Sequence, residues 1–107
     1  MAVVADLTRF HLPAEHFDVI LNFYYLQRDL WAKYRRFLRP GGILVIETLT
    51  QEMHGLRPDI DPLYLLRPGE LQAAFRDWQI LIYRESWVET ETRHPKAVAS
   101  LIARRPE

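Results

Sequence analysis

Two apolar segments on either side of an amphipathic one constrain this chain's fold more than any other feature. Residues 17–23 and 43–49 are aromatic and β-branched runs without clean polar alternation, as expected of strands covered on both faces of a parallel sheet. Between them, residues 25–38 repeat with a helical period, with apolar side chains on one face and charged ones on the other. Residues 39–42, Arg-Pro-Gly-Gly, end that helix. The pattern predicts a right-handed βαβ unit.

The other segments complete one α/β domain spanning residues 1–107, because a chain of 107 residues suffices for one compact core and not for two. Pro and Gly residues interrupt the chain between the apolar runs and mark its loops. The predicted elements are a short strand at 2–5, a loop at 7–16, a long loop at 50–67, a helix at 70–78, and a C-terminal antiparallel hairpin with strands at 80–88 and 97–103.

Charge and composition exclude several function classes. The 14 Lys and Arg residues equal the 14 Asp and Glu residues, so no overall positive field favours nucleic acid or acidic membranes. The absence of cysteine excludes disulfides, thiolate metal sites and a cysteine nucleophile. The apolar runs are far shorter than a membrane span, and the first residues lack the features of a signal peptide. We therefore expect a cytoplasmic protein that binds neither nucleic acid nor membrane.

Ionisable side chains give no strong catalytic or metal-binding motif. His11 and His16 lie five residues apart with Glu15 beside the second, but a loop pair without a third ligand is a weak metal signal, and we predict no metal site. The acids Glu15, Glu85, Glu89 and Glu91 lie in polar stretches typical of solvated surface. No Ser/His/Asp arrangement and no phosphate-binding glycine loop is present. The catalytic residues therefore stay unknown at this point.

Five short motifs, taken in order and spacing, resemble the second half of class I S-adenosylmethionine-dependent methyltransferases. The likeness is strongest to the small bacterial branch of tellurite-resistance-type enzymes, and it covers nearly the whole chain. The motifs are Ala5-Asp6-Leu7, Leu12-Pro13, Phe17-Asp18-Val19-Ile20, Leu38-Arg39-Pro40-Gly41-Gly42-Ile43-Leu44-Val45 and Leu66-Arg67-Pro68-Gly69-Glu70-Leu71.

The resemblance implies a partial Rossmann-like methyltransferase sheet with a C-terminal antiparallel β-hairpin. In that family the strand order is 3-2-1-4-5-7-6, with strand 7 antiparallel. Residues 2–5, 17–23 and 43–49 would correspond to strands 3, 4 and 5, and the hairpin to strands 6 and 7. Strands 1 and 2 have no counterpart, so the resemblance implies a truncated fold.

The resemblance also implies candidate site residues and an incomplete cofactor site. The family holds S-adenosylmethionine with a Gly-rich loop after strand 1, whereas no glycine precedes Gly41 here. The implied cofactor positions are Asp6, Leu7 and Asn22. Phe23, Tyr24 and Tyr25 follow strand 4 and would face the methyl acceptor, although tyrosines before an amphipathic helix are more often packing groups.

Glu47, near the end of the run 43–49, is either a polar group of the site or a strand-end residue, and the pattern favours the second. The implied function is methyl transfer to a small molecule, if missing N-terminal elements complete the fold. The alternative is a noncatalytic interaction or dimerisation module derived from such an enzyme.

Without strand 1, the apolar strand at 17–23 becomes an edge that invites pairing. Three outcomes are reasonable: two copies pair through this edge, the N-terminal run pairs along it, or a separate polypeptide completes the sheet. We expect a homodimer formed through the 17–23 edge or the N-terminal strand.

Overall fold

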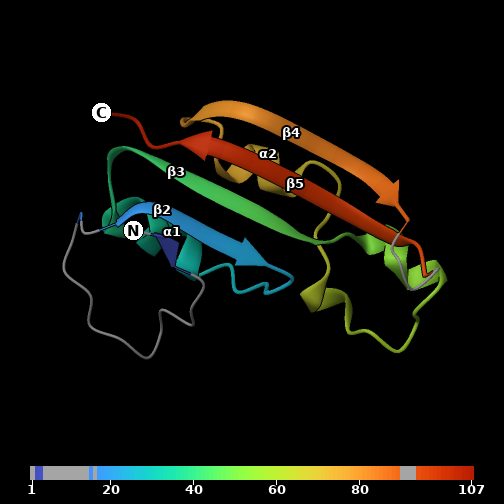
Figure 1. The fold of residues 1–107 in the computed structure, drawn as a ribbon. Coiled ribbons are helices and arrows are strands. Elements are labelled where there is room, and N and C mark those ends of the chain that lie inside the picture. The colour runs from blue at the N-terminus through green and yellow to red at the C-terminus, as the bar shows by residue number, and fades with distance from the viewer. Residues whose placement is uncertain (1, 4–14, 16, 90–93) are drawn as a thin grey trace.

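The structure, a computed structural model, describes residues 2–3, 15, 17–89 and 94–107 (Figure 1). Their strands form one five-stranded sheet in the order β1-β2-β3-β5-β4. The strands are β1 (Ala2–Val3), β2 (Phe17–Phe23), β3 (Leu38–Leu49), β4 (Gln79–Val88) and β5 (Lys96–Arg104), and the helices are α1 (Leu30–Phe37) and α2 (Glu70–Ala74) with the 3-10 helices η2 (Gln51–Gly55) and η3 (Pro62–Tyr64).

The order and directions of the strands confirm the predicted sheet. β2 and β3 are parallel, and β5 lies antiparallel between β3 and β4. This arrangement is the 4-5-7-6 part of the order that the resemblance implies, with the C-terminal hairpin placed as expected.

The N-terminal run pairs along the 17–23 strand, which is one of the three outcomes given above, and it does not take the place of strand 3. Ala2 and Val3 pair in parallel with Val19 and Ile20, so β1 lies directly beside β2. That place belongs to strand 1 in the family's order, and strand 3 would lie two positions further out. An unpaired apolar edge accepts the nearest extended segment, and here that segment belongs to the same chain. The predicted homodimer is not tested by this pairing and stays a prediction.

Both α-helices cover the same face of the sheet and form one core with it (Figure 1). Strand side chains alternate between faces, so Ile20, Leu44 and Leu101 point toward the helices and are fully or almost fully buried. From the helices, the core includes Leu30, Tyr34, Phe37, Leu71 and Phe75. The core therefore lies on one side of the sheet.

Helix α1 begins five residues later than the predicted range 25–38. Tyr24 has a left-handed backbone (φ 57°), which excludes it from a right-handed helix. The N–H groups of Leu30 and Trp31 donate to the carbonyls of Gln27 and Arg28 in short turns before the helix is established. The helix ends at Phe37, one residue before the predicted end, because Leu38 is already extended and Pro40 cannot continue a helix.

The Arg-Pro-Gly-Gly segment belongs to β3, which therefore begins at Leu38 and not at residue 43. Gly41 has φ 80°, a conformation that glycine adopts readily, and its N–H donates to the Arg105 carbonyl at 3.0 Å. A Cβ on Gly42 would come within 2.8 Å of the Arg39 carbonyl oxygen. Both glycines thus let the chain turn closely into the sheet.

Helix α2 ends at Ala74, earlier than the predicted range 70–78, although Phe75 and Trp78 still pack in the core as the helical pattern indicated. The chain leaves the helix at Phe75, whose backbone is no longer helical, so these two side chains reach the core from a turn. No helix in the described ranges is long and apolar enough to cross a membrane.

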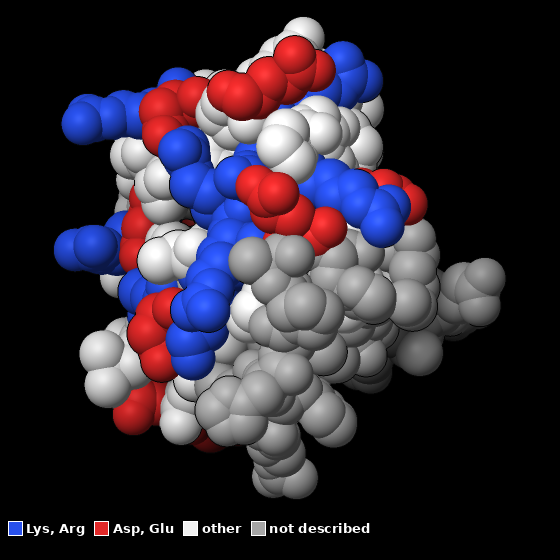
Figure 2. All heavy atoms as spheres, turned by 90° about the vertical axis from the view of Figure 1, so that its left-hand side faces the viewer, with Lys and Arg blue, Asp and Glu red and all other residues white. Residues whose placement is uncertain are grey.

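Opposite charges alternate at the end of the sheet where β2 and β3 begin. Figure 2 shows this side, with basic and acidic side chains next to one another. Arg39 pairs with Asp18 at 2.7 Å, and Arg105 pairs with Glu15 at 3.4 Å. The Arg39 guanidinium lowers the pKa of the Asp18 carboxyl by hydrogen bonding. These four side chains thus form two surface ion pairs at this end.

Candidate functional site

The candidate site lies at the opposite end of the sheet, where the parallel strands β2 and β3 terminate. Tyr24, the first residue after β2, is fixed to the neighbouring strand twice. Its N–H donates to the Glu47 carbonyl at 2.7 Å, and its hydroxyl donates to Glu47 Oε2 at 2.8 Å. A left-handed conformation is unfavourable for an aromatic residue, and such strained residues tend to cluster at functional sites.

Glu47 is the centre of a polar cluster on the sheet face opposite α1 and α2. Its register partner on β5 is Ser100, which faces Arg84 on β4. The Ser100 hydroxyl donates to Glu47 Oε1 at 2.5 Å, and Arg84 Nη2 lies 3.7 Å from the same oxygen. The Glu47 side chain is 23% exposed, so a ligand can reach its carboxylate.

The ammonium group of Lys96 lies over one face of the Tyr24 ring. Lys96 Nζ lies 4.6 Å from the ring centroid, at the start of β5. Burial raises the pKa of the Tyr24 phenol, and the hydrogen bond and negative charge of Glu47 raise it further. Tyr24 therefore stays protonated at neutral pH and acts as a hydrogen-bond donor.

We expect Glu47→Gln to lower the Tyr24 pKa part of the way back toward 10, because the charge is removed while burial stays. NMR titration with ring-labelled tyrosine measures each phenol separately. Glu85→Gln is the matched control, since Glu85 raises the pKa of Tyr83 in the same manner and should shift only that residue. An unchanged Tyr24 titration in Glu47→Gln would contradict the coupling.

A hollow of about 400 Å³ adjoins this cluster through Lys96. Its volume is within the range typical of small-molecule sites. Its apolar wall comes from Met53 and Leu56 on the 50–67 segment, and its polar rim includes Arg57 and His94. The segment predicted as a long loop thus forms part of a pocket beside the site.

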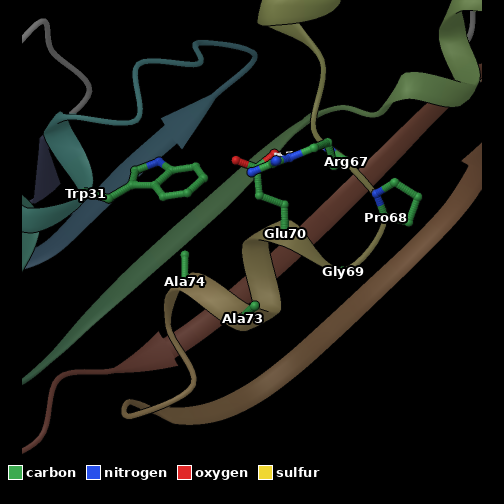
Figure 3. A pocket seen from close by; sticks show the side chains of 7 residues that line it. All are labelled: Trp31, Arg67, Pro68, Gly69, Glu70, Ala73 and Ala74. Carbon is green, nitrogen blue, oxygen red and sulfur yellow. Dashed lines mark hydrogen bonds and ion pairs between the residues drawn. The ribbon is translucent and has the colours of Figure 1, made fainter.

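A second hollow, of about 600 Å³, lies between α1 and α2 on the other side of the sheet (Figure 3). Trp31 faces Arg67 and Glu70 across it. Glu70 accepts hydrogen bonds from the Arg28 guanidinium, whose Nη1 also donates to the Leu63 carbonyl at 2.8 Å. These contacts connect the segment after β2 to η3 and α2. They therefore hold in place the segment that follows the candidate site.

The structure brings together only some of the residues predicted for the site. Phe23 ends β2 and Tyr24 and Tyr25 follow it, and the three are 45%, 47% and 42% exposed. Asn22 is buried on the helix side, where its Nδ2 donates to the Tyr34 hydroxyl at 2.6 Å. Asp6 and Leu7, predicted cofactor positions, lie outside the described residues, as do His11 and His16.

Sequence reasoning gave too little weight to Glu47 and missed Ser100, Arg84 and Lys96. A signal existed for two of them: Glu47 is the one charged residue in the run 43–49, and Ser100 the one polar residue in the run 97–103. Their meeting depends on the register between β3 and β5, which the sequence does not specify.

The residues present do not fit a complete S-adenosylmethionine site. All four glycines lie at position 41 or later, and Gly41 and Gly42 are at the far end of the sheet from Tyr24. The described residues that follow β2 therefore include no glycine at which backbone could approach a cofactor closely. One observation favours a bound polar group. Asn22 Oδ1 is buried without a hydrogen-bond partner in the described part of the chain.

The chain matches no protein-family model and no curated protein sequence. Solved structures do match. An S-adenosylmethionine-dependent methyltransferase from Methanosarcina mazei aligns with a TM-score of 0.72 at 17% identity, over 97% of this chain and 66% of that chain. The fold is that of S-adenosylmethionine-dependent methyltransferases.

Two further methyltransferase-type structures are similar. TehB from Haemophilus influenzae has a TM-score of 0.65 at 20% identity, over 85% of this chain and 36% of that one. An S-adenosylmethionine-dependent methyltransferase from Mesorhizobium loti has a TM-score of 0.64 at 19% identity, over 94% and 67%. The chain thus spans 36% to 67% of the length of these methyltransferase-fold structures. The narrower resemblance to the tellurite-resistance-type branch stays a prediction.

Proposed function

We propose that this chain is the acceptor-binding part of an S-adenosylmethionine-dependent methyltransferase that acts on a small molecule. The observation that carries the proposal is the sheet order β2-β3-β5-β4, with β5 antiparallel, which aligns with such an enzyme over 97% of the chain. The exposed polar cluster at the carboxyl ends of β2 and β3 supports it, because α/β sheets bind their ligands at that end.

Tyr24 and Glu47 are the residues that we assign to the acceptor. The Tyr24 hydroxyl donates its one proton to Glu47, and its oxygen accepts a hydrogen bond that orients an acceptor hydroxyl or amine. The Glu47 carboxylate has capacity for a further hydrogen bond beyond those from Tyr24 and Ser100, and it takes up the proton that a hydroxyl or amine loses when it is alkylated.

The 400 Å³ hollow supports an acceptor with an apolar part and an acidic group. Met53 and Leu56 provide apolar surface. Lys96 stands between the hollow and Tyr24, and it is the cation best placed to contact an acidic group, because Arg57 is already paired with Asp59 at 2.9 Å. The pocket size suits a small molecule and not a polymer.

The experiment uses the tagged chain expressed in its native host and isolated under mild conditions with whatever it binds. The sample is incubated with methyl-labelled S-adenosylmethionine and a small-molecule extract of the same cells. We expect a labelled small molecule, and a loss of at least tenfold in Glu47→Gln and Tyr24→Phe. Gln51→Ala, at an exposed position on η2, is the control and should keep the activity. No label above that of untagged cells would overturn the proposal.

The second candidate is a noncatalytic dimerisation module. The partly exposed apolar face opposite the helices favours it, since such surfaces mark interaction sites. A dimer mass by light scattering at micromolar concentration, together with no methyl transfer in the assay above, would favour this function. A monomer mass would exclude the homodimer.

A further inference from the structure

The hollow of about 600 Å³ between α1 and α2, called the α1–α2 hollow below, combines groups that the proposed function does not use. It is lined by Trp31 of α1, the segment 67–70 and two alanines of α2. Figure 3 shows the Trp31 indole on one side and the side chains of Arg67 and Glu70 on the other. Ala74 points toward the space between them, and its short side chain leaves that space unfilled. The volume is within the range typical of small-molecule sites.

The α1–α2 hollow is separate from the candidate acceptor site. Glu47 and its polar cluster lie on the sheet face opposite the helices, whereas this hollow lies on the helix side. Helix α1 contacts β3 and helix α2 contacts β5, so the hollow lies away from β1. The edge at β1 is where a complete methyltransferase sheet would continue. A ligand in this hollow therefore depends neither on the acceptor site nor on further strands.

The charges around the hollow leave one cation in excess. Glu70 accepts hydrogen bonds from Nε and Nη2 of Arg28, and its Oε1 lies 3.5 Å from Arg67 Nε. Two guanidinium groups thus share one carboxylate. The Arg67 side chain is 70% exposed, so its outer N–H groups can reach a ligand. One excess positive charge suits a monoanion, and a carboxylate can pair with a guanidinium through two parallel hydrogen bonds.

Trp31 provides the flat apolar surface of the hollow. Its ring lies 5.7 Å from the Phe75 ring, measured between centroids, with 53° between the planes. This contact holds the indole in place from the core side. Trp31 is only partly buried and lines the hollow. Aromatic rings pair with other flat rings in offset or edge-to-face arrangements. A ligand with both a flat ring and an acidic group would therefore contact Trp31 and Arg67 together.

We propose that the α1–α2 hollow binds a small aromatic carboxylate, whose ring packs against Trp31 and whose carboxylate pairs with Arg67. A phosphate monoester fits less well. Its charge of about −2 at neutral pH exceeds the single excess positive charge, and it would face the Glu70 carboxylate. The proposed binding does not require methyl transfer, so it can hold even if the proposed function fails.

Titration of the chain with indole-3-acetate, followed by proton–nitrogen NMR of the tryptophan indole N–H groups, tests the proposal. The chain has three tryptophans, and the variant Trp31→Phe identifies the Trp31 signal. We expect that signal to shift saturably, with a Kd of about 1 mM or tighter for a probe of this size. The neutral probe indole-3-acetamide should bind at least about tenfold more weakly, because it lacks the charge that pairs with Arg67.

Two variants test the cation and the space separately. Arg67→Gln removes the charge, and Ala73→Leu fills part of the hollow from an exposed position on α2. Each should weaken the binding of indole-3-acetate at least about tenfold. Arg76→Gln and Gln72→Leu are the matched controls, since both positions are exposed and neither lines the hollow. Their Kd should equal that of the wild type. Circular dichroism confirms that each variant is folded.

The comparison of the two probes needs no variant, so it tests the proposal even if a variant fails to fold. The absence of a saturable shift at Trp31, or equal binding of the acid and the amide, would overturn the proposal. Binding at wild-type strength by folded Arg67→Gln or Ala73→Leu would overturn it as well.

Discussion

Leu44→Ala is expected to lower the free energy of unfolding by about 3–4 kcal/mol, whereas Ile43→Ala lowers it by only about 1 kcal/mol. The two residues are neighbours on β3 and lose a similar volume. Leu44 points toward α1 and α2 and has no exposed surface. Ile43 lies on the opposite face of the sheet, which neither α-helix covers, and is partly exposed. The difference follows from a core that lies on one side of the sheet.

Urea unfolding at neutral pH, followed by circular dichroism, measures both changes on the isolated chain. The comparison is informative because strand position, pairing partners and side-chain size are nearly matched. Equal losses in the two variants would show that the second face is also packed in the isolated chain, and would contradict a core that lies on one side of the sheet.

Glu70→Gln is expected to cost about 2–3 kcal/mol of stability at pH 7. The Glu70 side chain is only 9% exposed and accepts hydrogen bonds from the Arg28 guanidinium and the Arg67 N–H. These contacts lower its pKa from 4.5 to about 2, with the Arg28 hydrogen bond as the main cause. Without the carboxylate, the part-buried Arg28 charge loses its partner.

The same pKa fixes how this contribution changes with pH. The folded-state pKa is lower than the unfolded one, so the stabilisation is fully present above about pH 4.5 and is lost as the pH falls toward 2. The stability difference between the wild type and Glu70→Gln should therefore shrink between pH 7 and pH 2.5. Asp59→Asn is the control, because its pair with Arg57 is exposed and the unfolding midpoint should not move. A difference that stays constant with pH would contradict the assigned role of Glu70.

The sequence was sufficient to predict the central strands and the order of the strands in the sheet. The apolar runs around 17–23 and 43–49 allow little except a parallel pair, and the connection between them has one favoured handedness. For the N-terminal run, the sequence left open whether it takes the place of strand 3 or pairs along the 17–23 strand, and the structure shows the second. The start of α1 was also wrong, since periodicity does not reveal the left-handed turn at Tyr24.

The sequence could predict only those residues of the candidate site that lie next to one another in the chain. The aromatic residues after β2 follow from the position of that strand. Glu47 and Ser100 each stand out as polar positions in apolar runs, but they lie 53 residues apart and meet only through the β3–β5 register. The 400 Å³ hollow depends on the path of residues 50–67, which local patterns left as an undivided loop.

Calorimetric titration of this chain alone with S-adenosylmethionine tests the central claim most directly. The claim is that the chain has the acceptor side of a methyltransferase fold without a glycine cradle for the cofactor. The account predicts no saturable heat of binding by the isolated chain, with circular dichroism confirming that the sample is folded. Tight, saturable binding of one S-adenosylmethionine per chain would contradict it.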